Sequence, residues 1–160
     1  MNKTITLILA LLLGTASNAQ TNIDLGGISA DPKAPIEVSA DNLSVDQDSG
    51  TAVFSGNVVI GQGDLRLSAG SVRVVYSDST GDIAQLLATD GVTLVTDSEA
   101  AEAATADYNL TTGILTLSGS VLLTQGASAI SAEQMTIDLN SGRAQMSGRV
   151  RTVFQQDGNN

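Results

Sequence analysis

The chain of 160 residues contains no cysteine, no histidine and no tryptophan. Without cysteine, disulfide bonds and thiol chemistry are excluded. Without histidine, the commonest general base and a common metal ligand are missing, and a serine such as Ser120 has no imidazole to activate it. These absences argue against an enzyme, and we expect neither a cofactor nor a metal site.

Positive charge is also scarce, with 7 Lys and Arg against 17 Asp and Glu and a net charge of −10. Nucleic acid binding needs a basic patch, so the composition argues against a nucleic acid partner. Asp46 and Asp48 lack the ligand spacing of an EF-hand, and we interpret them as turn residues. A run of acids in the second half of the chain is interpreted as a solvated face: Asp97, Glu99, Glu102 and Asp107.

The most apolar stretch, ITLILALLLG at 5–14, is too short to span a membrane. Lys3 precedes it and Ser17-Asn18-Ala19 follows it, which predicts a secretory signal peptide over 1–19, cut after Ala19. A retained anchor is the alternative. We therefore expect an exported, periplasmic protein with a flexible leader at 20–35, one domain at 36–154 and a disordered tail at 155–160.

From Ile36 onward, short runs of alternating apolar and polar residues are separated by Gly, Asp, Asn and Ser. This pattern is typical of an all-β domain with many short strands. The turn segments are DQDSG at 46–50, GQGD at 61–64, SDSTGD at 77–82, TDG at 89–91, TTG at 111–113 and LNSG at 139–142.

Part of the chain is repeated. Residues 54–76 align with residues 117–139 without a gap, and weaker copies lie at 40–60, 106–123 and 132–152. Each unit ends in a glycine before a hydrophobic segment, at Gly56, Gly91, Gly119 and Gly148. Such a period predicts stacked two-strand units that share one core.

Positions that stay apolar between the copies sit two apart, so they should lie on one inner face of the sheet. Arg73 and Asp138 have the opposite parity and should face water. We expect two layers of antiparallel strands, with nothing polar on the inner face. Leu43, Val45 and Val150 belong to this predicted face. An ordinary filled core is one interpretation, but few aromatic residues fill it and open strand edges invite added strands.

Residues 35–76 read PIEVSADNLSVDQDSGTAVFSGNVVIGQGDLRLSAGSVRVVY. Pro-Ile before an alternating strand is followed by Ser-Ala-Asp, by Phe-Ser-Gly-Asn-Val and by Gln-Gly. Their order and spacing resemble the opening of the OstA/LptA-like family of periplasmic lipopolysaccharide transport proteins. The resemblance covers roughly residues 35–154 and weakens in 77–105.

The resemblance implies a folded antiparallel β-jelly-roll, an open V-shaped two-layer sheet that binds the acyl chains of lipid A in an apolar groove. It further implies that copies of the chain stack edge to edge. The implied partners are lipopolysaccharide, an LptC-like inner-membrane protein and the N-terminal domain of an LptD-like outer-membrane protein. We expect a bridge that carries lipopolysaccharide from the inner to the outer membrane.

The family's lipid-contacting positions correspond here to Ile36, Leu94, Tyr108 and Leu110, and Phe54 matches a family aromatic residue. All of them also lie on the inner face that alternation predicts. The two arguments together predict these lipid-binding residues: Ile36, Val38, Phe54, Val58, Ile60, Leu67, Val74, Tyr76, Leu94, Tyr108, Leu110 and Leu117.

Two alternatives stay open: a structural or adhesive β-repeat protein without a ligand, and a periplasmic carrier of another lipid. One further hypothesis concerns Arg143, Arg149 and Arg151, which crowd the last strands while most acids lie earlier. These arginines could meet the acidic head group of the glycolipid, or an acidic neighbouring protein.

Overall fold

The computed structural model describes residues 22–24, 28, 30–31 and 33–154, and the regular elements in these residues are all strands. The predicted signal peptide and C-terminal tail lie outside the described residues. The strands are β1 (Asn22–Asp24), β2 (Ile36–Ser39), β3 (Asn42–Asp46), β4 (Thr51–Gln62), β5 (Leu65–Tyr76), β6 (Ile83–Val95), β7 (Glu99–Ala103), β8 (Thr105–Asn109), β9 (Ile114–Gln125), β10 (Ser128–Asp138), β11 (Arg143–Ser147) and β12 (Arg151–Val153).

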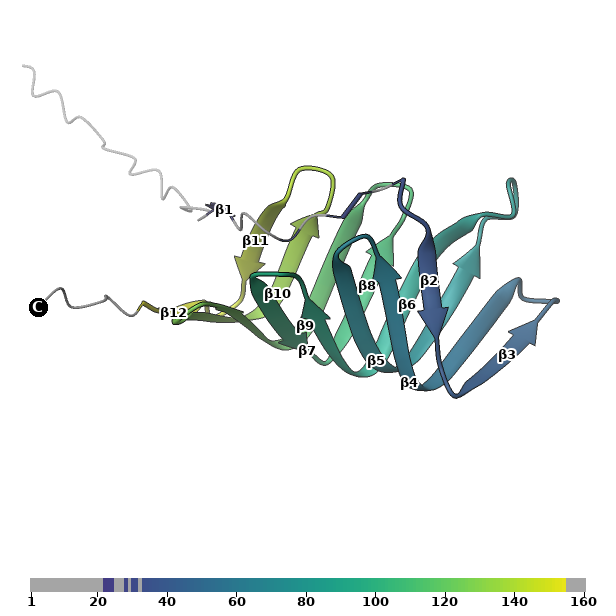
Figure 1. The fold of residues 1–160 in the computed structure, drawn as a ribbon, viewed down its shortest axis with the longest axis horizontal. Helices are drawn as coiled ribbons and strands as arrows, with labels where there is room; N and C mark the ends of the chain where they lie inside the picture. The colour runs from purple at the N-terminus through teal and green to yellow at the C-terminus, as the bar shows by residue number, and fades with distance from the viewer. Residues whose placement is uncertain (1–21, 25–27, 29, 32, 155–160) are drawn as a thin grey trace, which may run out of the picture.

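The strands form one 12-stranded sheet in the order β1-β11-β10-β9-β7-β6-β5-β4-β2, and the registered pairs are antiparallel. β3, β8 and β12 lie off this path, pairing with β4, with β6 and β9, and with β10. The two halves of a long strand therefore have different partners: residues 85–88 of β6 pair with β8, and residues 92–95 pair with β7. Figure 1 shows the resulting sheet folded along its middle.

The fold divides the sheet into two arms. The β2 arm contains β2, β7, β12 and residues 58–62, 65–69, 92–95, 121–125 and 128–132 of the long strands. The β3 arm contains β1, β3, β8, β11 and residues 51–55, 71–76, 83–89, 114–118 and 134–138. The expected all-β, folded antiparallel jelly-roll is confirmed.

The bend between the arms, which we call the hinge line, depends on left-handed backbone conformations. Gly56 and Asn57 have φ of 78° and 46°, and Gly119 and Ser120 have 85° and 50°. A Cβ at Gly119 would lie 2.7 Å from the Cβ of Ala104, so a larger residue would clash as well as strain the backbone. The four glycines that end the sequence repeats, including Gly91 and Gly148, all have positive φ and lie on this line.

The inner faces of the two arms pack into one hydrophobic core. Parity assigns most of it correctly: Leu67, Leu94 and Leu117 are buried, while Arg73 is exposed. A register shift between β5 and β6 lies between Ala69 and Ser71, where the alternation of buried side chains along β5 changes parity. Alternation along strands therefore decides which side chains the sheet encloses.

The structure contradicts the prediction for Leu43, Val45 and Val150, because these side chains lie outside the enclosed core. Leu43 and Val45 pair with Phe54 and Ala52 and so share their face, but they are 56% and 62% exposed. β3 pairs with β4 alone, so it ends the β3 arm. Val150 lies between β11 and β12, beside the hinge line, and is also exposed.

The prediction that nothing polar interrupts the inner face is wrong, because Gln62 and Glu99 are buried. Glu99 also departs from the predicted solvated acidic face, of which Asp97 and Glu102 are indeed exposed. It lies two residues before the buried Ala101 on β7 and therefore points inward. Its carboxylate accepts hydrogen bonds from Gln125 Nε2 at 2.9 Å and from the Thr96 hydroxyl at 3.4 Å.

Candidate apolar groove between the arms

Cross-strand registry lines up the inward side chains in rows that run the length of the sheet. On the β2 arm, one row contains Val38, Ile60, Leu67, Leu94, Ala101, Leu123 and Ile130. On the β3 arm, one row contains Phe54, Val72, Ala88, Ala106, Leu117, Met135 and Met146. A second contains Ala52, Val74, Leu86, Tyr108, Leu115, Ile137 and Ala144. The apolar side chains of the two arms therefore form continuous rows that face each other along the molecule, and we call the region between them the lane.

The structure buries or partly buries the predicted lipid-binding residues, with one exception. Seven of them are buried in the core: Val58, Ile60, Leu67, Val74, Leu94, Tyr108 and Leu117. Four are partly buried and packed against it: Ile36, Val38, Phe54 and Leu110. Tyr76 is 38% exposed, because a register shift between Val75 and Tyr76 ends the regular pairing of β5 there. Their binding of lipid stays a prediction.

The middle of the lane is closed in this structure. The space between Ile60 and Leu67 on the β2 arm and Leu86 and Leu115 on the β3 arm amounts to about 10 Å³. That volume is at the lower limit for holding one water molecule. A ligand in the middle of the lane therefore requires the two arms to move apart.

The side of the molecule away from the hinge line is here called the mouth. A wider hollow of about 440 Å³ opens there. Ile36 and Tyr76 line it together with Tyr108 and Leu110. All four are predicted lipid-binding residues, so the hollow at the mouth coincides with part of the predicted site. The side chain of Gln62 forms another part of its wall.

Gln62 and Tyr108 join the two arms at the mouth. Gln62 ends β4 on the β2 arm, and Tyr108 lies in β8 on the β3 arm. The Tyr108 hydroxyl donates a hydrogen bond of 2.9 Å to Gln62 Oε1, and burial raises the pKa of the Tyr108 phenol above its usual 10.0. This interaction satisfies two polar groups that would be costly to bury alone. Sequence reasoning missed Gln62, although it continues the alternation of Val58 and Ile60.

The outer face differs in character from the lane. A trough of about 620 Å³ on the β3 arm is lined mainly by polar side chains, including Arg73, Asp107 and Thr116. Gln85 Nε2 donates a hydrogen bond of 2.7 Å to Asp107 Oδ1 near it. The predicted outward orientation of Arg73 is confirmed. The two faces of the β3 arm therefore divide into an apolar inner and a polar outer surface.

In the part of the chain that the structure describes, no three acidic side chains lie together in a group that could hold a metal ion. The same residues include no helix of the length and apolarity needed to cross a membrane. Asp46 and Asp48 belong to a turn, as predicted. Asp46 Oδ1 accepts hydrogen bonds from the backbone N–H groups of Asp48 at 2.9 Å and Ser49 at 3.2 Å.

Comparison with known proteins places this fold in a family. The family model described as LptA/(LptD N-terminal domain) LPS transport protein matches residues 37–143, which is more than half of the chain. The crystal structure of LptH from Pseudomonas aeruginosa, described as the LptA homologous periplasmic component of a lipopolysaccharide transport device, superposes with a TM-score of 0.70. The match covers 79% of this chain and 99% of that one at 20% identity, which supports the fold.

Sequence relatives agree with the family match. An uncharacterised protein of Rhizobium meliloti is 29% identical over 154 residues, covering 89% of this chain and 83% of that protein. Lipopolysaccharide export system protein LptH of Pseudomonas aeruginosa is 33% identical over 75 residues, covering 47% of this chain and 42% of that protein. The family match and the fold together define a β-jelly-roll of the lipopolysaccharide transport class. The chain belongs to the LptA/LptD N-terminal domain family.

Proposed function

We propose that this protein is a periplasmic bridge that carries lipopolysaccharide from the inner to the outer membrane, with the acyl chains of lipid A between the two arms. The observation that carries the proposal is the continuous apolar lane, found in a member of a lipopolysaccharide transport family. Each CH₂ group moved from water into such a lane contributes about 0.8 kcal/mol. The protein then acts as a passive shelter and not as an enzyme.

The mouth supports the same proposal. Its hollow has apolar and polar walls side by side, with Ile36 and Leu110 near Gln62 and Asp82. An amphipathic lipid needs such a boundary, because its acyl chains seek the lane while its sugars and phosphates stay hydrated. The sugars would therefore lie outside the mouth.

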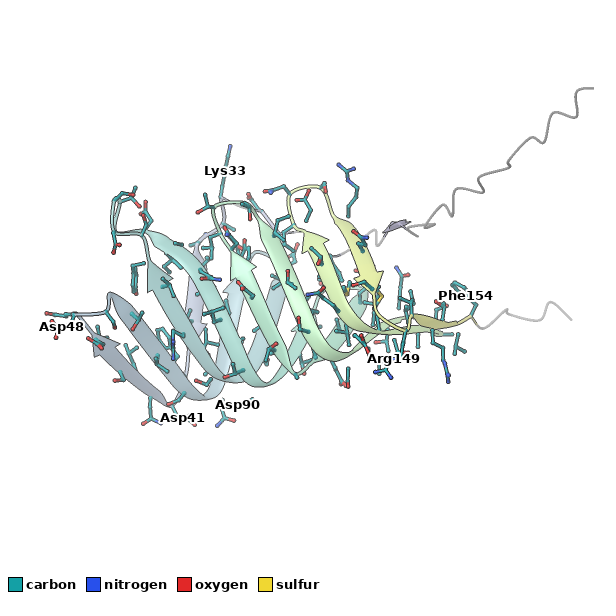
Figure 2. All side chains as sticks on the ribbon, turned by 180° about the vertical axis from the view of Figure 1, so that it is seen from behind. Lys33, Asp41, Asp48, Asp90, Arg149 and Phe154 are labelled. Atoms are coloured by element: carbon teal, nitrogen blue, oxygen red, sulfur yellow. The ribbon has the colours of Figure 1, made fainter. Side chains whose placement is uncertain are left out.

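The two ends of the sheet support edge-to-edge stacking with further copies and with the jelly-roll domains of LptC-like and LptD-like partners. At one end, β3 exposes Leu43 and Val45. At the other end, Phe154 follows β12 and is 74% exposed. Figure 2 shows Asp41 and Asp48 at the β3 end and Arg149 and Phe154 at the β12 end. Apolar strand edges of opposite charge are suited to join head to tail.

The test is the lipid that accompanies the protein when it is purified from the periplasm. We expect mass spectrometry of the extract to identify lipopolysaccharide. Leu94→Glu should reduce the bound amount at least about tenfold, because a carboxylate in the lane is costly to bury. Thr93→Glu, on the opposite face of the same strand, is the matched control and should keep the lipid. Circular dichroism checks that both variants are folded.

Two results would contradict the proposal. Another lipid in the extract would indicate a periplasmic carrier of that lipid. No lipid, from folded protein, would favour a structural or adhesive β-repeat protein, and the nearly filled middle of the lane is the observation that keeps this second candidate in view.

A further inference from the structure

One segment outside the sheet is packed into the core. The described residues between β1 and β2 that cross the mouth, Ile28, Ala30, Asp31, Lys33 and Ala34, are here called the strap. Ile28 is 1% exposed and ranks among the most deeply buried side chains, and Ala30 is also buried. In Figure 1 the coloured parts of this segment lie along the upper rim of the sheet, between β11 and β2. The sequence predicts a flexible leader here, so this burial is unexpected.

Hydrogen bonds join the strap to both arms at the mouth. The Ala30 N–H donates a hydrogen bond of 3.4 Å to the carbonyl of Leu139, in the turn after β10 on the β3 arm. The Ala34 carbonyl accepts one of 3.3 Å from Gln62 Nε2, at the end of β4 on the β2 arm. In between, the Ala34 N–H bonds the Asp31 carbonyl at 2.9 Å and turns the chain. The strap therefore spans the opening between the arms.

Gln62 connects the strap to the contact between the arms. Its Oε1 accepts the Tyr108 hydroxyl from the opposite arm, while its Nε2 reaches the strap. Separation of the arms breaks the hydrogen bond between Tyr108 and Gln62. The buried side-chain amide of Gln62 then keeps only its hydrogen bond to the strap. Figure 2 shows Lys33 on the side of the molecule opposite Asp41 and Asp90, which mark the hinge line. The strap and the hinge line thus lie on opposite long sides of the lane, and the hollow lined by Ile36, Tyr76 and Leu110 stays open beside the strap.

β1 extends this closure to the end of the sheet. It pairs with β11 through Asn22↔Gln145, Ile23↔Ala144 and Asp24↔Arg143. β11 would otherwise be the edge of the β3 arm, where a stacked neighbour would add its own strand. β1, which precedes the strap in the chain, therefore occupies one strand edge.

We propose that the strap is an intramolecular plug: it covers the part of the mouth between Leu139 and Gln62 while the lane is empty, and it leaves when lipopolysaccharide enters. The plug rests on the proposed function, since it regulates that same lane. Ile28 holds the apolar position that an acyl chain takes after displacement. Release of the strap also frees β1 to leave β11, so filling of the lane and stacking of the next copy are linked.

A disulfide lock tests the plug directly. A Cβ placed on Gly63 would lie 4.0 Å from the Cβ of Ala34, within the range of disulfide bonds. The chain has no cysteine of its own, so Ala34→Cys with Gly63→Cys makes one defined crosslink between strap and β2 arm. Gly63 has φ of 58°, so the single variant Gly63→Cys controls for backbone strain. The probe is fluorescently labelled purified lipopolysaccharide.

The oxidised double variant should bind the probe at least about tenfold more weakly than its reduced form. The reduced form should match the two single variants. Equal binding by the oxidised and reduced forms, with the wild type binding normally, would overturn the plug and leave the proposed function standing. No binding by the wild type would overturn the proposed function, and the plug with it.

A second variant keeps the plug testable if the double variant does not fold. Ile28→Ser removes the apolar anchor and should raise the affinity for the same probe about tenfold, because less free energy is spent on displacing the strap. Lys33→Ser, exposed on the same segment, is the matched control and should leave the affinity unchanged. An unchanged affinity in Ile28→Ser would overturn the plug.

Discussion

At the scale of residues, one small polar side chain organises each of three equivalent turns. Asp46 Oδ1, Asn109 Oδ1 and Asp138 Oδ1 accept backbone N–H groups two or three residues ahead. The turns after Asn109 and Asp138 close with hydrogen bonds from Gly113 and Gly142 back to those residues. Hydrogen bonds to the carboxylates hold the pKa of Asp46, chiefly through the Ser49 N–H, and of Asp138, chiefly through the Ser141 hydroxyl, below 3.8. The ionised form is therefore the one that fits the turn.

This shift predicts part of the acid sensitivity of the fold. Because the pKa of Asp138 is lower in the folded state than its ordinary value of 3.8, its ionisation stabilises the folded state above pH 3.8. That contribution is lost as the pH falls through the lowered pKa. Asp138→Asn keeps an acceptor oxygen, as Asn109 shows, but cannot titrate. We expect its urea midpoint to fall less than that of the wild type between about pH 6 and about pH 2.5.

Asp64→Asn, an exposed carboxylate in the turn between β4 and β5, is the matched control for the unfolding experiment. It removes the same single negative charge. If Asp138→Asn loses as much stability with acid as the wild type does, the Asp138 carboxylate contributes nothing through its ionisation.

Single residues also mark the limit of what alternation can predict. Apolar positions two apart identify the buried Val72 and Val74 correctly. Glu99 is misassigned because a run of acids suggests water, whereas the position of a side chain on its strand decides its direction. Ile28 carries no signal, because it is held by tertiary packing and not by the repeats. Such contacts depend on where a segment lies after folding, which local pattern cannot supply.

At the scale of elements, the repeated two-strand unit explains both the bend and the open ends. Glycines at the ends of the units supply the left-handed residues of the hinge line, so each added unit extends both arms together. Repeats stacked in this way leave an edge at each end. The sequence predicts the units and their turns, but not that β3 would stand uncovered, since this depends on the length of the opposite arm.

The exposed ends predict how stacking responds to charge. Reversal of Arg143, Arg149 and Arg151 to Glu should raise the dissociation constant between copies at least about tenfold, because both ends of the molecule are then acidic. Asp48→Arg should weaken self-association in the same way from the other end. Multi-angle light scattering of wild type and both variants measures the effect.

Mixing the two variants provides the control for this experiment. The acidic β12 end of one then meets the β3 end of the other, and dimers should reappear. The Arg149 side chain already contacts Glu133 at 2.6 Å, but this pair lies on the surface, where such bridges are worth little. The arginine hypothesis fails if the triple variant stacks and binds lipopolysaccharide as the wild type does.

At the scale of the whole molecule, the account describes two apolar walls held together on both sides. The hinge line fixes one side covalently, while Gln62, Tyr108 and the strap close the other by hydrogen bonds and one buried isoleucine. The second side is the weaker one, so opening should occur there. In a molecule built in this way, side chains can nearly fill the lane when no ligand is bound, and the lane can still open to admit a lipid.

The measurement that tests this account most directly is photocrosslinking to lipopolysaccharide in cells. A photoreactive residue replaces Leu94 or Tyr108 inside the lane, or Arg73 or Asp138 with outward parity as controls. The account predicts adducts at Leu94 and Tyr108 and none at Arg73 and Asp138. Adducts at neither inner position, in protein that is folded and exported, would mean that the space between the arms is only a core.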